Sequence, residues 1–242
     1  MDLSVPSWVI PGTYGENLVF LADKPEITGV ELLFFLYDGE IKALLDTEWK
    51  IIVAHGRRFT YTVHLPDQVK PEHGELIERF LPLARYFIVH PYPPEAAETQ
   101  ERLLSFWAEK YGKGDKTVFG GNPFLIENTL PGRQETLLRR LPQDTGLCMD
   151  TGHLLLEGKN PAAFFTVYQN RLGEIHLHDL DPEKAGRDGR LADHRPLDAG
   201  NGWLKELLPR LRGFPGVINL ELFSWDEISR SIDVLKEFDL IP

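Results

Sequence analysis

A carboxylate and an imidazole lie close together in the segment TGLCMDTGHLLL, residues 145–156. The first half of this segment has the apolar character of a buried strand. Asp150 follows the apolar run, and His153 comes three residues later. An aspartate at this point can cap the next helix by accepting backbone N–H bonds. It can equally hold a ligand together with the histidine, so the function of the pair depends on what else lies near it.

The elements that would position this pair recur along the chain as strand-like runs, each followed by an amphipathic stretch. The predicted strands are residues 7–12, 30–36, 60–65, 86–91, 124–128, 147–150, 174–179 and 217–223. The predicted helices are residues 15–23, 40–56, 72–84, 95–111, 132–140, 160–170, 202–212 and 225–238.

Eight strand–helix units in 242 residues predict the α/β class and a closed parallel (β/α)8 barrel, with residues 1–242 as a single domain. A doubly wound sheet is the alternative architecture. It would bring a glycine-rich phosphate-binding turn after the first strand, and the sequence has none there.

Titratable side chains gather at the carboxyl ends of the predicted strands, where the active sites of such barrels form. They are His64, His90, Glu127, Asp150, His176, His178 and Glu221, followed by His153 after strand six and by Asp193 and His194 in the long loop after strand seven. Because side chains alternate along a strand, His176 is expected to face the barrel axis while Ile175 and Leu177 face the helices. The same alternation turns His178 and Glu221 inward.

Imidazoles and carboxylates that converge without thiols form the nitrogen and oxygen ligand set of zinc, manganese or a related divalent ion. Buried carboxylates repel one another and raise each other's pKa, and a cation removes that conflict. We therefore expect Asp150 and His153 to hold metal together with the rest of the set. His55 and His73 fall in or beside helices and are expected to be structural and solvated.

Acidic residues outnumber basic ones 37 to 26, which gives a net charge of −11. Phosphate backbones are bound mainly through Lys and Arg, so nucleic acid is not an expected partner. The single cysteine, Cys148, excludes an internal disulfide and a cysteine-based zinc site. The N-terminal residues lack the features of a signal peptide, and no apolar run approaches the ~20 residues that span a bilayer. We expect a cytoplasmic protein with a small-molecule substrate and no membrane partner.

Four of these residues resemble the ligand set of the xylose isomerase-like TIM barrels, a superfamily shared by sugar isomerases, epimerases and endonuclease IV. The set is matched by Glu127 in LIEN, Asp150 in CMDTGH, His176 in EIHLHD and Glu221 in NLEL. The endonuclease-like branch has further ligand positions, which are matched by His64 in VHLP, His90 in VHP, His153 and His194. That branch carries an Asp two residues before its last His. Here position 192 is Ala and the acid is Asp193, so the sequence leaves open whether Asp193 serves a third cation.

Within the superfamily the chain most resembles the cobamide-remodelling phosphodiesterases, the CbiR family. The similar segments are GVELLFF, FTYTVHLP, MDTGHLLLEGKNP, IHLHD, DHRPLD and NLELFSWDEISRSIDVLK. The resemblance implies hydrolysis of the phosphodiester in the nucleotide loop of a cobamide. That reaction would release a ribazole-type nucleoside and leave a corrinoid phosphate.

Metal-assisted phosphodiester hydrolysis uses two cations that share a bridging carboxylate, and Glu127 is the candidate for that bridge. The expected ligands are His64 and His90 for one ion and Asp150, His176 and Glu221 for the other, with His153 and His194 holding a third ion or contacting the phosphate. The predicted catalytic residues are Glu127, Glu221 and His178. We expect His178 to orient His176 or a bound water.

The alternative function is a divalent-metal sugar or sugar-phosphate isomerase or epimerase. There a single metal polarises a carbonyl while Glu127 and Glu221 move the proton. That chemistry leaves His64, His90 and His194 without a required role. The number of bound ions separates the two functions, because two or more per chain favour hydrolysis and one favours isomerisation.

The longest connection in the chain covers residues 179–202 and carries Lys184 with Arg187, Arg190 and Arg195. Loops of this length often act as lids, so the three arginines are predicted to bind substrate, and a solvated charged loop is the alternative. Several aromatic residues lie near the predicted strand ends and either line a wide pocket or pack the barrel. They are Trp8, Tyr14, Tyr37, Tyr92 and Phe223. The oligomeric state does not follow from the sequence.

Overall fold

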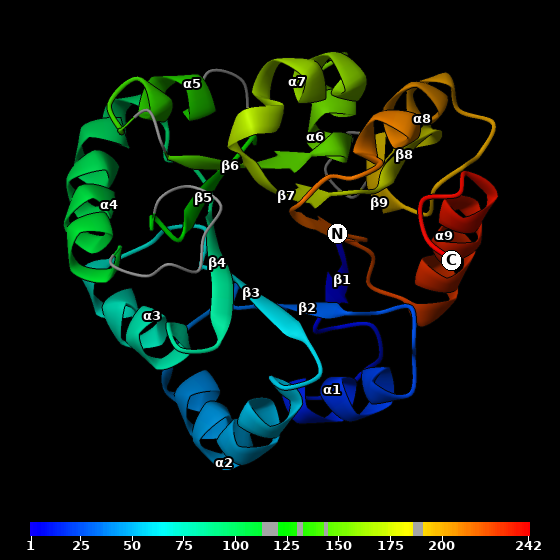
Figure 1. Ribbon diagram of the computed structural model, residues 1–242. Coiled ribbons are helices and arrows are strands. Elements are labelled where there is room, and N and C mark those ends of the chain that lie inside the picture. Colours follow the sequence, from blue (N-terminus) through cyan, green and yellow to red (C-terminus); the bar gives the residue numbers. More distant parts are fainter. Residues whose placement is uncertain (113–120, 130–132, 143–144, 186–190) are drawn as a thin grey trace.

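Eight parallel strands close into a barrel in the computed structural model, which describes residues 1–112, 121–129, 133–142, 145–185 and 191–242 (Figure 1). Around the barrel the strands follow the order β1-β10-β7-β6-β5-β4-β3-β2. Their bounds are β1 Asp2–Pro6, β2 Gly29–Leu33, β3 Thr60–His64, β4 Ala84–Val89, β5 Phe124–Glu127, β6 Gly146–Asp150, β7 Leu172–His176 and β10 Val217–Asn219. The predicted α/β class and barrel architecture are confirmed.

Helices follow the strands and surround the barrel (Figure 1). They are α1 Tyr14–Ala22, α2 Gly39–His55, α3 Gly74–Phe80, α4 Ala97–Tyr111, α5 Arg133–Leu138, α6 Thr151–Leu156, α7 Pro161–Tyr168, α8 Gly202–Leu207 and α9 Trp225–Glu237. Short 3-10 helices adjoin them at Pro71–His73, Pro94–Ala96, Gln169–Arg171 and Leu208–Leu211. Several helices begin at a side-chain cap. Thr13 and Glu16 form a reciprocal capping box at α1, and Asp38 and Asn160 accept backbone N–H bonds at α2 and α7.

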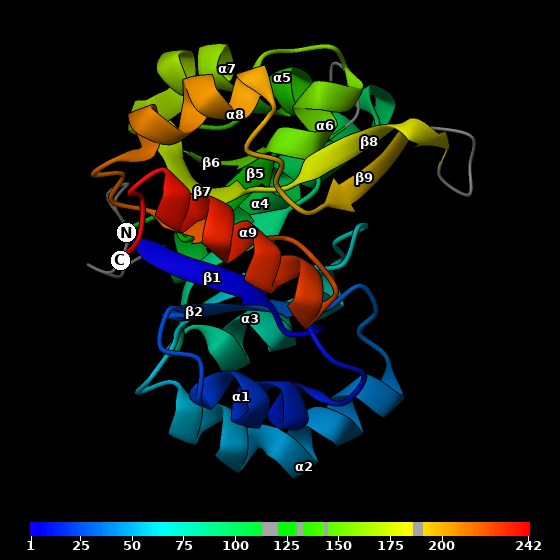
Figure 2. The same cartoon turned by 90° about the vertical axis from the view of Figure 1, so that its right-hand side faces the viewer.

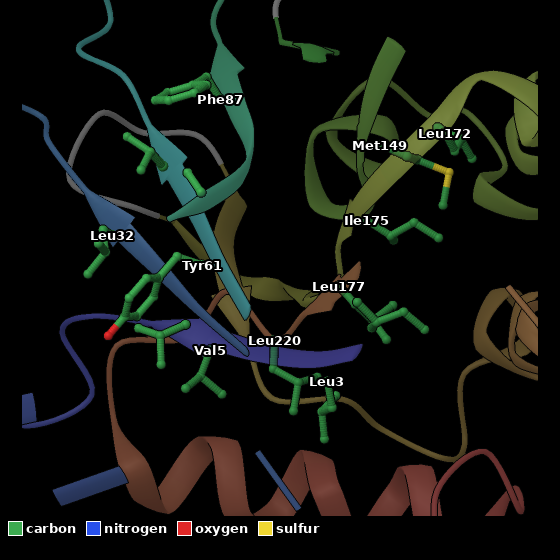
Figure 3. Close-up of a cluster of buried hydrophobic side chains, with 14 of the residues drawn as sticks. Leu3, Val5, Leu32, Tyr61, Phe87, Met149, Leu172, Ile175, Leu177 and Leu220 are labelled. Carbon is green, nitrogen blue, oxygen red and sulfur yellow. The ribbon is translucent and has the colours of Figure 1, made fainter. Parts of the chain in front are cut away.

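Because successive side chains along a strand point to opposite faces, the apolar residues form two separate clusters, as the sequence predicts. Val5, Leu32 and Ile175 leave the strands on the outer face and belong to the large core between barrel and helices (Figure 3). Leu177 and Leu220 pack in the same outer core. The inner face carries a separate buried cluster, formed by Tyr86, Ile88, Leu125, Cys148 and Val217.

The first strand departs most from the sequence prediction, which put it at residues 7–12. It runs from Asp2 to Pro6, because these residues hold the parallel register with β10 and β2. Beyond Pro6 the chain leaves the barrel, and Trp8 is 53% exposed in the loop that follows. The apolar run at residues 8–10 therefore belongs to a loop at the mouth of the barrel.

The long connection after β7 contains an antiparallel hairpin where the sequence predicted a loop. Its strands are β8 (Asp179–Ala185) and β9 (Leu191–Arg195), and they project beyond the barrel on the side opposite the two termini (Figure 2). Asp179 fixes the base of the hairpin. Its carboxylate accepts bonds from Asn201 Nδ2 at 2.5 Å and Trp203 Nε1 at 3.2 Å.

Most of the barrel strands end earlier than predicted, and one short helix was not predicted. β7 ends at His176 and β10 at Asn219, so His178 and Glu221 lie just beyond the strand ends. The unpredicted helix, α6, begins directly after Asp150 and carries His153. None of the helices in the described ranges combines the length and apolar character that a bilayer-crossing segment requires.

Candidate metal centre

The predicted ligands converge at the carboxyl ends of the barrel strands. His64, Glu127, Asp150 and His176 are the last residues of β3, β5, β6 and β7, while His90 directly follows β4. A cavity of about 300 Å³ opens at this point. Its wall is formed by His64, His90, Glu127, His153, His194 and Glu221, together with the rings of Trp8, Phe35 and Phe223.

Glu127 is the first of two buried carboxylates on which histidines converge. Its Oε2 lies 3.3 Å from His64 Nε2, 3.3 Å from His90 Nε2 and 3.5 Å from His176 Nδ1. Its Oε1 lies 3.3 Å from His153 Nδ1. Because Glu127 is only 1% exposed, these imidazoles take the place that water would otherwise occupy around the carboxylate.

Glu221 is the second buried carboxylate of this kind. Its Oε2 lies 3.3 Å from His176 Nδ1, 3.5 Å from His194 Nε2 and 3.6 Å from His178 Nε2. His176 Nδ1 thus faces both Glu221 and Glu127. The imidazole of His176 joins the two carboxylates into one centre.

The outer ring nitrogens of His64 and His90 are each held by an oxygen. His64 Nδ1 lies 3.0 Å from the carbonyl oxygen of Leu65, and His90 Nδ1 lies 3.0 Å from Asp67 Oδ1. An outer N–H that donates to an oxygen fixes the orientation of the ring and leaves the lone pair of the inner nitrogen for a cation. Both inner nitrogens face Glu127.

His176 and His194 are held in the same way. His176 Nε2 lies 3.2 Å from Glu31 Oε1, and His194 Nδ1 lies 3.1 Å from Asp193 Oδ1. The carboxylate of Asp193 contacts the outer nitrogen of His194, so Asp193 supports a candidate ligand from behind.

Asp150 both caps α6 and belongs to the centre, so the two explanations for it apply together. Its Oδ1 accepts the backbone N–H of His153 at 2.7 Å, and its Oδ2 lies 3.4 Å from His153 Nδ1. The side-chain amide of Asn128 holds the Asp150 backbone through both its N–H and its carbonyl, at 2.8 and 2.9 Å. The carbonyl oxygen of Asn128 also lies 3.0 Å from His153 Nδ1. Asn128 therefore fixes both members of the pair.

The hydrogen bonds of His178 fix which of its ring nitrogens acts as the donor. Its Nδ1 accepts the backbone N–H of His194 at 3.0 Å, so that nitrogen carries no proton. The proton of the neutral ring is then on Nε2, which lies 3.2 Å from Asp150 Oδ2. His178 donates this N–H to Asp150 and does not offer a lone pair there. It positions the Asp150 carboxylate.

The space for His178 exists because residue 152 is a glycine. A Cβ atom on Gly152 would lie 2.0 Å from His178 Cε1. On its other side the ring stacks on His194, with centroids 4.3 Å apart and planes at 8°. His194 has a φ of 50°, a left-handed conformation that costs about 1–2 kcal/mol for a residue with a side chain. The ring stacking and the N–H bond to His178 Nδ1 are the contacts that accompany this strained backbone conformation at His194.

Electrostatic attraction between the side chains of the centre changes their pKa values more than burial does. Burial alone would raise the pKa of Glu127 and Glu221, but the neighbouring imidazoles hold the pKa of both carboxyls well below their usual range. Burial alone would lower the pKa of the histidines. The facing carboxylates instead raise the pKa to about 10 at His90 and His153 and to about 11 at His194. Without a cation, protons occupy the positions between ring and carboxylate.

The side chains present fit a divalent cation. Within the described ranges, His176 Nδ1 and Glu221 Oε2 are buried without a hydrogen-bond partner, and they lie 3.3 Å apart. A cation bound to both atoms would satisfy them. Cys148 also brings its sulfur within ligand range of Glu127 and His176, but burial raises the pKa of its thiol well above the usual value. The thiol therefore stays protonated, and the donors are nitrogen and oxygen.

Of the three arginines predicted to bind substrate, Arg195 is the one that lies in the described residues. Arg187 and Arg190 lie outside the described residues. Arg195 directs Nη1 to Glu227 Oε1 on α9 at 3.7 Å and does not line the cavity. Of the predicted aromatic residues, Trp8 and Phe223 line the cavity.

The two histidines set aside as structural lie away from the centre. His73 is 6% exposed, so the prediction that it is solvated was wrong. Its Nδ1 accepts the backbone N–H of Lys70 at 3.2 Å. This hydrogen bond lies at the start of the 3-10 helix Pro71–His73. His55 is half-buried on α2, with Nδ1 2.9 Å from the carbonyl oxygen of Ile51.

The residues that support the ligands were not predicted from the sequence. They are Glu31, Asp67, Asn128 and Gly152, together with Phe35 in the cavity wall. Glu31 gave a usable signal, because it is an acid at an inward position of an otherwise apolar strand. Asp67 and Gly152 gave none, because only the folded chain brings them against His90 and His178.

A sequence profile of the family described as xylose isomerase-like TIM barrel matches residues 113–238, just over half of the 242-residue chain. An inosose dehydratase of Lacticaseibacillus casei is 37% identical over 59 residues. These residues are 24% of this chain and 19% of the dehydratase, so the match spans about a fifth of that relative's length.

Solved structures with similar folds cover nearly the whole chain. The probable 3-DHS dehydratase AsbF of Bacillus anthracis has a TM-score of 0.67 at 13% identity, over 99% of both chains. The 3-keto-D-glucoside 4-epimerase YcjR of E. coli has a TM-score of 0.64 at 14% identity, over 100% of both chains. The IolI protein, solved with a zinc atom, has a TM-score of 0.63 at 16% identity, over 99% of this chain and 97% of that one. At these identities the likeness establishes the fold.

Binding of cations should release protons. His90, His153 and His194 have pKa values of about 10 to 11 in the metal-free protein and must be neutral at the nitrogen that binds. Below those values protons compete with the cation, so zinc affinity should rise with pH by about tenfold per unit for each proton displaced. Calorimetric titration of the chelator-treated protein, in buffers of different ionisation enthalpy, should show more than one proton released per chain. Binding that releases no protons and does not depend on pH would contradict this account.

Gly152→Ala should weaken cation binding without contacting a ligand. The new Cβ would displace the His178 ring and with it the N–H bond to Asp150, so zinc affinity should fall by about 10- to 100-fold. Gly39→Ala is the matched control, because a Cβ at that helix start meets no atom within 4 Å. In a His178→Ala background the clash is gone, so adding Gly152→Ala should change zinc affinity no further. A folded Gly152→Ala protein with unchanged affinity would remove this role from His178.

Proposed function

The chain belongs to the xylose isomerase-like TIM barrel family, and from that premise we propose that it is a metal-dependent phosphodiesterase with at least two divalent cations at the barrel mouth. The observation that carries the proposal is the position of Glu127. His64 and His90 approach this carboxylate at Oε2, and His153 approaches it at Oε1. A carboxylate with imidazoles at both oxygens is suited to bridge two ions.

The proposed assignment follows the groups of ligand atoms that lie within range of one another. His64, His90 and Glu127 form one group, and Glu127, Asp150 and His153 form another. Glu221 and His176 adjoin both through His176 Nδ1. We propose zinc as the cation, with manganese as the other suitable ion, because nitrogen and oxygen donors predominate and the IolI structure contains zinc.

Bound divalent cations would supply Lewis acidity and the activation of water near neutral pH. The chain's own residues would provide positioning and exclude water. His64, His90 and His194 are fixed from outside by oxygens, so their inner nitrogens need little rearrangement to bind. His178 orients Asp150 by donating Nε2–H to its carboxylate. His153 lines the cavity, and we propose that it either serves as a metal ligand or contacts the phosphate.

The second candidate is a single-metal isomerase, epimerase or dehydratase acting on a sugar or related polyol. The names of the relatives favour it, because they include two dehydratases and an epimerase. Glu127, Asp150, His176 and Glu221 would be sufficient for that chemistry, with the two glutamates moving the proton. This candidate leaves the fixed orientations of His64, His90 and His194 without a use, and for that reason we rank it second.

The proposed substrate is a cobamide, whose nucleotide loop contains one internal phosphodiester. The similarity of the segments around His64, Asp150, His176 and Glu221 to cobamide-remodelling phosphodiesterases supports it. The net charge of −11 disfavours long polyanions such as DNA, which require many basic contacts, and is compatible with a molecule that carries a single phosphate.

The number of bound ions tests the bridging arrangement. Replacing both His64 and His90 with Ala should lower the zinc content of the metal-loaded protein by about one ion per chain, because that ion loses two of its ligands. His55→Ala, on α2 and away from the centre, should leave the content unchanged. Elemental analysis after gel filtration measures both. An unchanged ion count in the double variant would favour the single-metal candidate.

The substrate assignment is tested by offering three substrate classes to the metal-loaded protein. We expect cleavage of a cobamide to a corrinoid phosphate and a nucleoside, seen by chromatography and stopped by a chelator. Abasic duplex DNA should be nicked poorly or not at all, as judged on a gel. Interconversion of ketoses without cobamide cleavage would transfer the assignment to the isomerase candidate, and DNA nicking without cobamide cleavage would transfer it to DNA repair.

A further inference from the structure

Three aromatic rings border the cavity above the candidate metal centre. Trp8 follows β1, Phe35 follows β2 and Phe223 lies beyond β10, and these three strands are neighbours in the barrel. Trp8 and Phe35 have ring centroids 6.1 Å apart. We call the side chains of Trp8, Phe35 and Phe223 the aromatic rim, and Leu36 follows Phe35 in the chain.

The aromatic rim is exposed to an extent that core packing does not explain. Trp8 is 53% exposed, Phe35 and Phe223 are each 40% exposed, and Leu36 is 69% exposed. Single exposed apolar residues are common on proteins, but a contiguous group beside a cavity marks a binding surface. In the described part of the chain, Phe106 on α4 is the other aromatic side chain with comparable exposure, and it lies outside this cavity.

The aromatic rim is continuous with the metal centre at both ends. The Phe35 ring lies 6.1 Å from the imidazole of His64, and the Phe223 ring lies 5.2 Å from that of His194. A group bound over the cations would therefore have the rings directly beside it. Whatever is attached to that group must lie against this apolar arc or leave the cavity.

The composition of the cavity wall indicates what the attached group is. Apart from the titratable residues of the centre, the described residues of the wall are the three rings. A polyol needs amide, hydroxyl or charged side chains to pair its hydroxyl groups, because a buried polar group without a partner is costly. A flat ring with few polar atoms has no such need, and it stacks favourably on aromatic side chains.

We infer that the aromatic rim is a subsite for a planar, weakly polar ring group of the substrate, held beside the group that binds over the cations. The inference rests on the proposed function, since the metal-bound group is taken to be a phosphate ester. A cavity of about 300 Å³ is at the small end of ligand sites. It suits one ring system and its phosphate, with the rest of a larger substrate lying outside the cavity.

The test is a series of phosphate monoesters that differ in their ring alone. Methyl, phenyl and 1-naphthyl phosphate are titrated calorimetrically into the zinc-loaded full-length chain. We expect affinity to increase along the series, with at least about tenfold between methyl and naphthyl phosphate. Trp8→Ala combined with Phe35→Ala should remove this gain and leave methyl phosphate binding unchanged. Trp8→Phe should retain most of it, and Phe106→Ala, which removes an exposed ring outside the cavity, should change nothing.

The outcomes separate this inference from the proposed function. Equal affinity for the three esters in the wild-type protein overturns the inference, even if a cobamide is cleaved. A gradient that disappears in the double variant supports the inference, even if the protein hydrolyses no phosphodiester. A double variant that loses affinity equally for all three esters shows that the rings support the metal centre and not a substrate ring. Failure of every ester to bind contradicts both proposals.

Discussion

Burial of two carboxylates at the mouth of the barrel is the constraint from which the rest of the site follows. Glu127 and Glu221 are 1% and 5% exposed, and an isolated carboxylate in such a position would be strongly destabilised or would take up a proton. Imidazoles surround both groups, and most of these rings are held in turn by an outer oxygen from Glu31, Asp67, Asp193 or a main-chain carbonyl. The result is a layered arrangement of carboxylate, ring and anchor. Its donors are in position before any ligand binds, which is the condition for strong electrostatic interaction with a ligand.

The same alternation that brings these side chains inward continues below them. Glu31 accepts hydrogen bonds from His176 Nε2 and from the amide of Asn219. Glu174, two residues before His176, accepts one from Thr62 Oγ1 at 3.1 Å, and burial together with the nearby Glu31 raises its pKa well above the usual range. A protonated Glu174 avoids a second negative charge beside Glu31. A polar layer that contains Glu31 and Glu174 therefore lies below the centre. The apolar cluster around Ile88 and Leu125 fills the barrel elsewhere.

Access to the centre is set by elements outside the regular barrel. The base of the β8–β9 hairpin supplies two stacked histidines, of which His178 fixes Asp150 and His194 faces Glu221. The arc from β10 through β1 to β2 supplies the aromatic rim. Barrels of this kind support many reactions because such additions vary while the strand ends stay in place. Among the described residues of the cavity wall, the additions beside the titratable side chains are the rings of Trp8, Phe35 and Phe223.

Local sequence patterns were sufficient to predict the barrel and the titratable residues that meet at its mouth. Both follow from local pattern, because apolar periodicity reports strands and helices, and alternation reports which side chains turn inward. The strand bounds, the hairpin and the roles of the ring nitrogens depend on contacts that form only in the folded chain. The first strand was misplaced because strand bounds depend on the partners of Asp2–Pro6 in β10 and β2, and the hairpin after β7 depends on contacts that Asp179 makes with Asn201 and Trp203. The roles of individual ring nitrogens are equally non-local. Glu31 and His176 are 145 positions apart, and Gly152 leaves room for a ring 26 residues later, at His178. The sequence shows where a histidine is. Which of its nitrogens carries the proton depends on neighbours that only the closed barrel brings into contact.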